Sequence, residues 1–241
     1  QSQAGWHDLG WAQGAVGHVG GGAARVGGEH GKGGLSLGEV EGVGEVGELG
    51  SSVPVEAVVA AGWFGVVEDL LDVSKIEQGG MQFQFSDTDI RPLIKSITDE
   101  LSVAATNKGL TLNLQIPDQG DFKVSADELK LWQVLLNLID NSIKYTRAGT
   151  IDAIVEEKGN YIRISIKDTG MGMTEETKSQ LFQKFNRGEG GKVNTGGSGL
   201  GLYLAKEIVL AHKGKVWVES EGVEKGSTFI VELRKLSAPA V

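Results

Sequence analysis

The chain of 241 residues has no cysteine and only four prolines. Without cysteine there is no disulfide, no thiolate metal site and no cysteine nucleophile. So little proline excludes a collagen-like repeat, although glycine is abundant. The formal net charge of −9 argues against a nucleic-acid-binding protein. The longest apolar run, Ala57 to Val67, is too short to cross a bilayer, and nothing resembles a signal peptide, so we expect a cytoplasmic location.

Residues 1–67 contain no isoleucine, asparagine, threonine, tyrosine or methionine, yet they hold 19 of the 37 glycines. Glycine makes ordering costly in conformational entropy, and few large apolar side chains are present to offset it, so we expect a mostly disordered segment. Its commonest residue types all have codons that begin with G. Translation in the wrong reading frame is therefore a second explanation, beside a natural low-complexity leader.

Beyond residue 67 the hydrophobic pattern predicts regular helices and strands. The predicted helices are Glu68–Gln78, Arg91–Asn107, a central helix that follows Asp127 and includes Leu131–Tyr145, a short helix within Glu175–Phe185, and Leu200–His212. The predicted strands are Phe83–Phe85, Leu110–Ile116, Phe122–Ser125, Ile151–Glu157, Tyr161–Asp168, Lys215–Glu219 and Ser227–Leu233. Together they predict an α+β fold, a two-layer sandwich of a mixed, mostly antiparallel sheet with helices on one face.

The central helix carries both an apolar stripe and a polar row. The stripe is expected from Leu129, Trp132, Leu136, Ile139 and Ile143. Asn137, Asn141 and Lys144 recur at steps of four and three, so they share another face. Carboxamide oxygens suit a hard cation such as Mg²⁺, and an ammonium group suits a phosphate. A solvated polar face is the alternative for this helix taken alone.

Two further segments have the composition of a nucleotide site. The loop TGGSGLG, Thr195–Gly201, precedes an apolar helix, so its backbone can approach an anion at a helix N-terminus. It matches neither the P-loop nor the dinucleotide fingerprint. Asp168 ends a strand before Gly170 and Gly172, where its carboxylate can accept a hydrogen bond from an exocyclic amine such as that of adenine. An ordinary aspartate at a turn is the alternative.

Taken together, these motifs resemble the catalytic, ATP-binding domain of sensor histidine kinases, within the gyrase-type ATPase superfamily. LLNLIDNSIKYT resembles the asparagine box of that family, DTGMGM its first glycine box, LFQKF its phenylalanine box, GGSGLGLYLAKEI its second glycine box and GSTFIVEL its closing strand. The resemblance covers about Glu68–Lys235 and implies the Bergerat-type ATP-binding fold. Residues 68–80 resemble the end of the dimerisation hairpin and its hinge, and residues 81–236 the catalytic domain.

The resemblance implies ATP and Mg²⁺ as cofactors and assigns a role to each matching residue. Asn137 and Asn141 would hold Mg²⁺, and Asn137, Lys144 and Arg187 would act at the phosphates. The nucleotide would be bound by Asn141, Tyr145, Asp168, Gly170, Gly172, Thr195, Gly197, Ser198, Gly199, Leu200, Gly201 and Thr228. Asp168 would bind the adenine amino group with help from Thr228. Phe182 and Phe185 would pin the loop between the boxes or serve as plain core residues.

Asn137 also distinguishes branches of the superfamily. The ATP-hydrolysing relatives have a glutamate four residues before the magnesium asparagine, where it acts as a general base on water. A carboxamide cannot accept that proton, so a kinase is favoured over a hydrolase. An anti-sigma-factor-type serine kinase is a further possibility, but the hinge sequence SKIEQGG matches the histidine-kinase arrangement.

The phosphoacceptor histidine of such kinases has no counterpart in this sequence. None of the four histidines lies in the H-E/D-x-R-T/N-P context of the first hairpin helix. We therefore expect the chain to bind Mg-ATP and to phosphorylate an acceptor hairpin only in trans, with a response regulator receiver domain as the next acceptor. Intact members of the family are homodimers and are often membrane-anchored. The alternative is a non-catalytic ATP-binding or regulatory module of the same fold.

Overall fold

The computed structural model describes residues 67–186 and 198–236. All of them belong to the second of the two units, residues 1–60 and 61–241, into which the chain divides. The glycine-rich segment, apart from Val67, lies outside the described residues, so its expected disorder remains a prediction. The predicted site residues Arg187, Thr195 and Gly197 also lie outside them.

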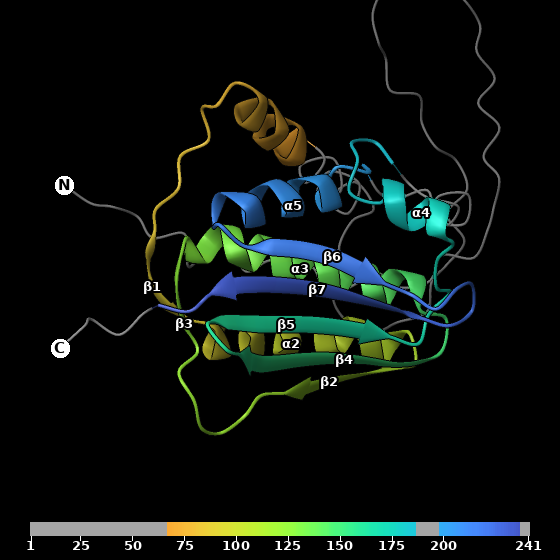
Figure 1. The fold of residues 1–241 in the computed structure, drawn as a ribbon. Helices are drawn as coiled ribbons and strands as arrows, with labels where there is room; N and C mark the ends of the chain where they lie inside the picture. The colour runs from red at the N-terminus through yellow and green to blue at the C-terminus, as the bar shows by residue number, and fades with distance from the viewer. Residues whose placement is uncertain (1–66, 187–197, 237–241) are drawn as a thin grey trace, which may run out of the picture. The chain divides into compact units, whose positions relative to one another are not determined.

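A helix over residues 67–77 comes first in the described part of the chain. In chain order the labelled elements are β1 (Ser86–Asp89), α2 (Ile90–Asn107), β2 (Leu110–Gln115), β3 (Lys123–Ala126), α3 (Glu128–Tyr145), β4 (Gly149–Lys158), β5 (Tyr161–Asp168), α4 (Glu175–Gln180), α5 (Gly201–Ala211), β6 (Lys215–Glu219) and β7 (Ser227–Arg234) (Figure 1).

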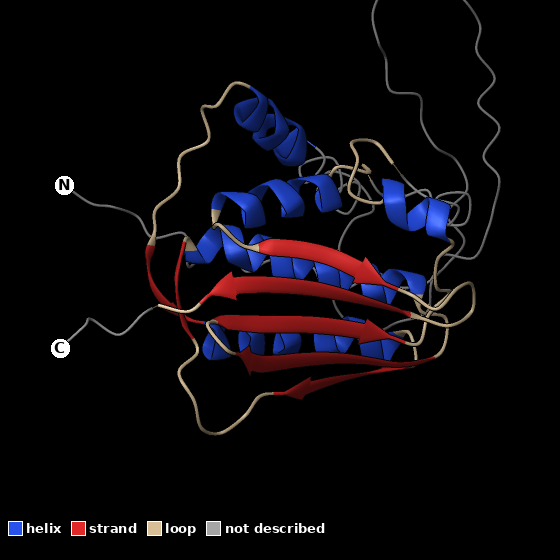
Figure 2. Cartoon of the chain, in the orientation of Figure 1, coloured by secondary structure: helices blue, strands red, loops and turns tan. Residues whose placement is uncertain are grey.

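One five-stranded sheet has the order β2-β4-β5-β7-β6, and β1 pairs with β3 separately. The β2–β4 pair is parallel, and the other pairs of the large sheet are antiparallel. The helices α2, α3 and α5 pack against the sheet, beside β2, β5 and β6 respectively (Figure 2). This confirms the predicted two-layer sandwich with a mixed, mostly antiparallel sheet.

The core lies between that helical layer and the sheet. On β5 the side chains of Ile162, Ile164 and Ile166 are fully buried, while the residues between them are exposed or half-buried. This period of two places the isoleucines against α3, which contributes the fully buried Leu135 and Leu138. Each such side chain stabilises the fold by about 1.5–3 kcal/mol relative to leaving it in water.

The predicted apolar stripe of α3 is partly wrong. Leu129 is 81% exposed, and Trp132 and Leu136 are only half-buried. The buried positions are Leu131, Val134, Leu135, Leu138, Ile139, Ser142 and Ile143. The helix α3 contacts α2 on one side, α5 on the other and the sheet as well. Its buried face is therefore wider than the predicted stripe and is rotated about the helix axis relative to it.

One predicted strand needs correction. Phe83–Phe85 is not a strand: β1 begins at Ser86, where pairing with β3 starts, and the rings of Phe83 and Phe85 contact His212 instead. The short helix α4, Glu175–Gln180, lies within the range predicted for it, and the backbone of Phe185 has a positive φ of 58°. In the described part of the chain, no helix is both long and apolar enough to cross a membrane.

Candidate functional site

Both ends of α3 are fixed by polar side chains, which are buried at its start and exposed at its end. At its start, the Asp127 side chain accepts hydrogen bonds from the backbone N–H of Lys130 (3.1 Å) and of Gln84 (2.8 Å). The Asp127 N–H donates to His212 Nε2 at 3.0 Å. At its end, Lys108 Nζ donates to the carbonyls of Ile143 (2.6 Å) and Lys144 (2.7 Å), which the helix leaves unpaired. The side chains between these caps are therefore held on a rigid element.

Asn137 meets the first residue of α5. A Cβ atom on Gly201 would lie 2.7 Å from Asn137 Oδ1, closer than real side chains approach, so only glycine fits without displacing the asparagine. One turn further along α3, Asn141 Nδ2 donates to the Asn137 carbonyl at 2.7 Å. That bond leaves Asn141 Oδ1, the atom suited to a cation, available. The asparagine box and the second glycine box thus form one surface.

The first turn of α5 has no side-chain cap. Its N–H groups and the positive end of its dipole are available to an anion. The loop before it is shaped by Ser198, whose Oγ accepts from the Leu200 N–H at 3.2 Å, and by Gly199, with a φ of +71°. A Cβ on Gly199 would lie 3.0 Å from the Phe185 carbonyl carbon, so the loop rests against the backbone of the phenylalanine box.

Asp168 is buried at the end of β5, with 5% of its surface exposed. Its Oδ1 accepts hydrogen bonds from the N–H groups of Gly170 (2.8 Å) and Ser227 (3.2 Å). Burial raises the pKa of this carboxyl group, and the two N–H bonds oppose that rise. The bonds also fix the carboxylate's orientation, so that Oδ2 is the oxygen left for an amine.

The turn after Asp168 packs against the end of α3. A Cβ on Gly170 would lie 2.7 Å from both Asp168 Oδ1 and the Tyr145 carbonyl oxygen, and the Met171 N–H donates to that carbonyl at 3.2 Å. Gly172 has a φ of +62°, and a Cβ there would collide with the Gly222 carbonyl. The first glycine box therefore brings Asp168 beside Tyr145, as the two were expected to share a site.

Two predicted residues are placed differently. Thr228 pairs across the sheet with Lys167 and not with Asp168, and successive strand residues point to opposite faces. Thr228 therefore lies on the other face of the sheet, and Ser227 is the residue beside Asp168. Lys144 forms an ion pair with Asp140 at 2.5 Å on the helix surface, so it must leave this partner to reach a phosphate.

Ser142 was not anticipated. It is 1% exposed, and its Oγ is the one buried side-chain polar atom without a hydrogen bond among the described residues. Its hydroxyl lies close enough to Asp168 to oppose the rise of that carboxyl's pKa, although no hydrogen bond of ordinary geometry joins them. The available signal was a hydroxyl one helical turn after Leu138, on the buried face of α3.

The asparagines of α3 are candidate ligands for a cation. Among the described residues, no group of three or more carboxylate or histidine side chains could hold a metal. A Mg²⁺ ion needs only one or two protein oxygens when substrate phosphates and waters complete its shell. The Oδ1 atoms of Asn137 and Asn141 fit this requirement, because the two residues lie on successive turns of α3 and Asn137 faces the first residue of α5.

Comparison with known proteins agrees with this geometry. Residues 126–237 match the family described as histidine kinase-, DNA gyrase B-, and HSP90-like ATPase. The signal transduction histidine-protein kinase BarA of Escherichia coli (strain K12) is 33% identical over 170 residues, which is 68% of this chain and 18% of BarA. This part of the chain is a histidine kinase catalytic domain.

Solved structures show the same domain. Full-length ShkA in complex with AMPPNP superposes with a TM-score of 0.63 and 27% identity, over 73% of this chain and 37% of that one. The catalytic domain of the histidine kinase ThkA has a TM-score of 0.56 and 28% identity, over 64% of this chain and 97% of that one. ThkA has also been solved in complex with the response regulator protein TrrA. The curated and solved relatives of this domain are thus histidine kinases.

Proposed function

We propose that this domain binds Mg-ATP and transfers the γ-phosphoryl group to a histidine on a separate phosphoacceptor hairpin, from which it passes to an aspartate of a response regulator receiver domain. The observation that carries the proposal is the contact of Asn137 with Gly201. It joins the carboxamides of α3 to the free N–H groups of α5, while Asp168 lies buried at the end of β5.

At the phosphate end, the protein would position the phosphates and stabilise their negative charge. The Oδ1 atoms of Asn137 and Asn141 would hold Mg²⁺, which when bound neutralises charge on the phosphate oxygens. The N–H groups of Gly199 and Gly201 would donate to the phosphates, and that of Leu200 would join them after leaving Ser198 Oγ. Arg187, Thr195 and Gly197 are proposed to lie at the phosphates too, on the strength of the resemblance alone, and Lys144 would join after leaving Asp140.

At the base end, Asp168 would select adenine. Its Oδ1 is occupied by two N–H groups, so Oδ2 would accept from the exocyclic amine of the base. A guanine carbonyl at the same place would put two acceptors together and leave both unpaired, which costs about 1–3 kcal/mol or more. Tyr145 and Gly170, which border Asp168, would line the nucleoside.

The acceptor must be supplied from elsewhere. The one histidine among the described residues, His212, is 6% exposed. Its Nε2 accepts from the Asp127 N–H, and its Nδ1 lies 2.7 Å from the Ile208 carbonyl oxygen. Neither nitrogen is free to attack a phosphorus atom. Asn137 stands where a water-activating glutamate would be needed, so we propose transfer to a hairpin in trans, with a homodimer in the intact protein.

Phosphotransfer in trans tests the proposal. The purified chain is mixed with ATP, Mg²⁺ and a matched phosphoacceptor hairpin from a relative, and acid-labile phosphohistidine is measured on the hairpin. Labelling that depends on Asp168 and Asn141 is the expected result. ATP binding without any labelling, across several hairpins, would instead favour the non-catalytic ATP-binding module.

A further inference from the structure

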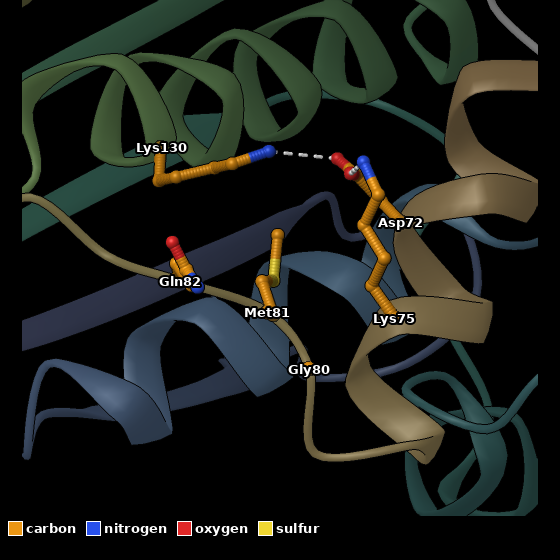
Figure 3. Close-up of a pocket in the computed structure, with 6 residues that line it drawn as sticks. All are labelled: Asp72, Lys75, Gly80, Met81, Gln82 and Lys130. Atoms are coloured by element: carbon orange, nitrogen blue, oxygen red, sulfur yellow. Dashed lines mark hydrogen bonds and ion pairs between the residues drawn. The ribbon is translucent and has the colours of Figure 1, made fainter.

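The helix over residues 67–77 contacts the catalytic domain through acidic side chains. Asp72 pairs with Lys130 of α3 at 2.8 Å (Figure 3), and Glu77 pairs with Lys184 in the phenylalanine box. Asp69 Oδ2 accepts a hydrogen bond from Ser198 Oγ at 3.1 Å. These three contacts lie on different segments of the domain, so they define how the helix docks.

The docking is largely polar. A cavity of about 270 Å³ lies between the helix, the linker and α3. Figure 3 shows the Asp72–Lys130 ion pair across it. Leu70 and Leu71 are 52% and 55% exposed, whereas Val73 is buried and Ile76 packs against the hydrophobic core. Two apolar side chains therefore oppose release of the helix, few enough for its docking to be reversible.

Asp69 lies among groups that would otherwise contact phosphate. Ser198 belongs to the loop before α5, and its Oγ also accepts from the Leu200 N–H. Burial raises the pKa of the Asp69 carboxyl, and the hydrogen bond from Ser198, with a smaller effect of the Lys144 charge, opposes that rise. The Asp69 carboxylate thus occupies a place where the Ser198 hydroxyl, and to a lesser extent the Lys144 charge, favour an anion.

We propose that Asp69 occupies the place of a phosphate group, so that the docked helix competes with the triphosphate of ATP for the loop at Ser198. The inference rests on the proposed function, because it requires that ATP binds at this loop. Two anions cannot share the hydroxyl and the nearby ammonium without strong repulsion. ATP binding then releases the helix, and whatever holds the helix docked weakens ATP binding by the same factor.

Removing the negative charge of Asp69 tests the proposed competition. Asp69→Asn removes the charge while keeping an acceptor for Ser198, and Glu68→Gln is the matched control, since Glu68 is its exposed neighbour on the same helix. Binding of ATP, ADP and adenosine to the full chain is measured by calorimetry in the presence of Mg²⁺. We expect about ten-fold tighter ATP binding for Asp69→Asn, within the usual range of coupling between sites, a smaller gain for ADP and none for adenosine.

The outcomes distinguish a failure of the proposed competition from a failure of the proposed function. Equal ATP affinity for Asp69→Asn and the unsubstituted chain overturns the competition, and so does an equal gain in Glu68→Gln or with adenosine. Absence of ATP binding in every variant overturns the proposed function itself. Hydrogen exchange gives a second readout: saturating ATP should raise the exchange of residues 69–77, and unchanged protection there contradicts release of the helix.

Discussion

Replacing Gly201 with alanine tests whether α3 and the first turn of α5 form one site. The added Cβ would lie 2.7 Å from Asn137 Oδ1 and 3.1 Å from its Cγ, so the asparagine side chain must rotate away. Alanine in place of glycine stabilises a helix by about 0.5–1 kcal/mol. Crowding costs about 1–3 kcal/mol in a well-packed place. The helix effect offsets only part of the crowding, so the net loss of unfolding free energy should lie between about 0 and 2.5 kcal/mol.

Nucleotide binding should suffer much more than stability. Displacing the Asn137 oxygen removes one proposed ligand of Mg²⁺, and a loss of about 1.4 kcal/mol or more corresponds to at least about ten-fold weaker ATP binding. Calorimetry with Mg-ATP measures the affinity, and chemical denaturation measures the stability. Gly80→Ala is the matched control, because its Cβ would meet only the Lys75 carbonyl oxygen at 3.7 Å. Gly201→Ala with unchanged ATP affinity would refute the reasoning.

Two further substitutions probe the base end. Folding raises the pKa of Asp168 above its ordinary value of 3.8, so the folded state holds the proton more tightly and the free energy of unfolding falls as the pH rises through that region. Asp168→Asn should flatten this decline in denaturation curves above about pH 4. It should also weaken ATP binding by about ten- to a hundred-fold, the worth of a hydrogen bond to a charged group. An unchanged pH slope would contradict the raised pKa of Asp168. Ser142→Ala removes an unpartnered hydroxyl and should leave stability unchanged or raise it by about 1 kcal/mol. A clear loss in urea denaturation would mean that the hydroxyl has a partner in solution.

The helices and strands could be predicted from local patterns because nearby residues define where each of them begins and ends. Asp127 was predicted as the residue before α3, and its side chain accepts a hydrogen bond from that helix, as the side chain of Asp89 does from α2. The alternation of isoleucines along β5 matches its buried face. Helix caps and the alternation of buried and exposed residues in a strand each involve only a few neighbouring residues, so a single sequence is enough to recognise them.

The remaining features depend on contacts that no local pattern contains. The exposure of Leu129 follows from how α3 lies between α2 and α5. The face occupied by Thr228 depends on the register of β7 against β5, where a shift of one residue would exchange it with Ser227. The Asp69–Ser198 bond joins positions 129 residues apart. Such contacts are defined by tertiary packing alone.

ATP binding in the presence and absence of Mg²⁺ tests the central claim most directly. The full chain, Asn141→Ala and the control Asn113→Ala, whose side chain bonds Asp152 on the sheet, are titrated with ATP by calorimetry. We predict that removing Mg²⁺ and replacing Asn141 each weaken binding at least about ten-fold, about 1.4 kcal/mol. In Asn141→Ala, Mg²⁺ should no longer strengthen binding, while Asn113→Ala should behave as the unsubstituted chain. ATP affinity that is unaffected by both Mg²⁺ and Asn141 would contradict the account.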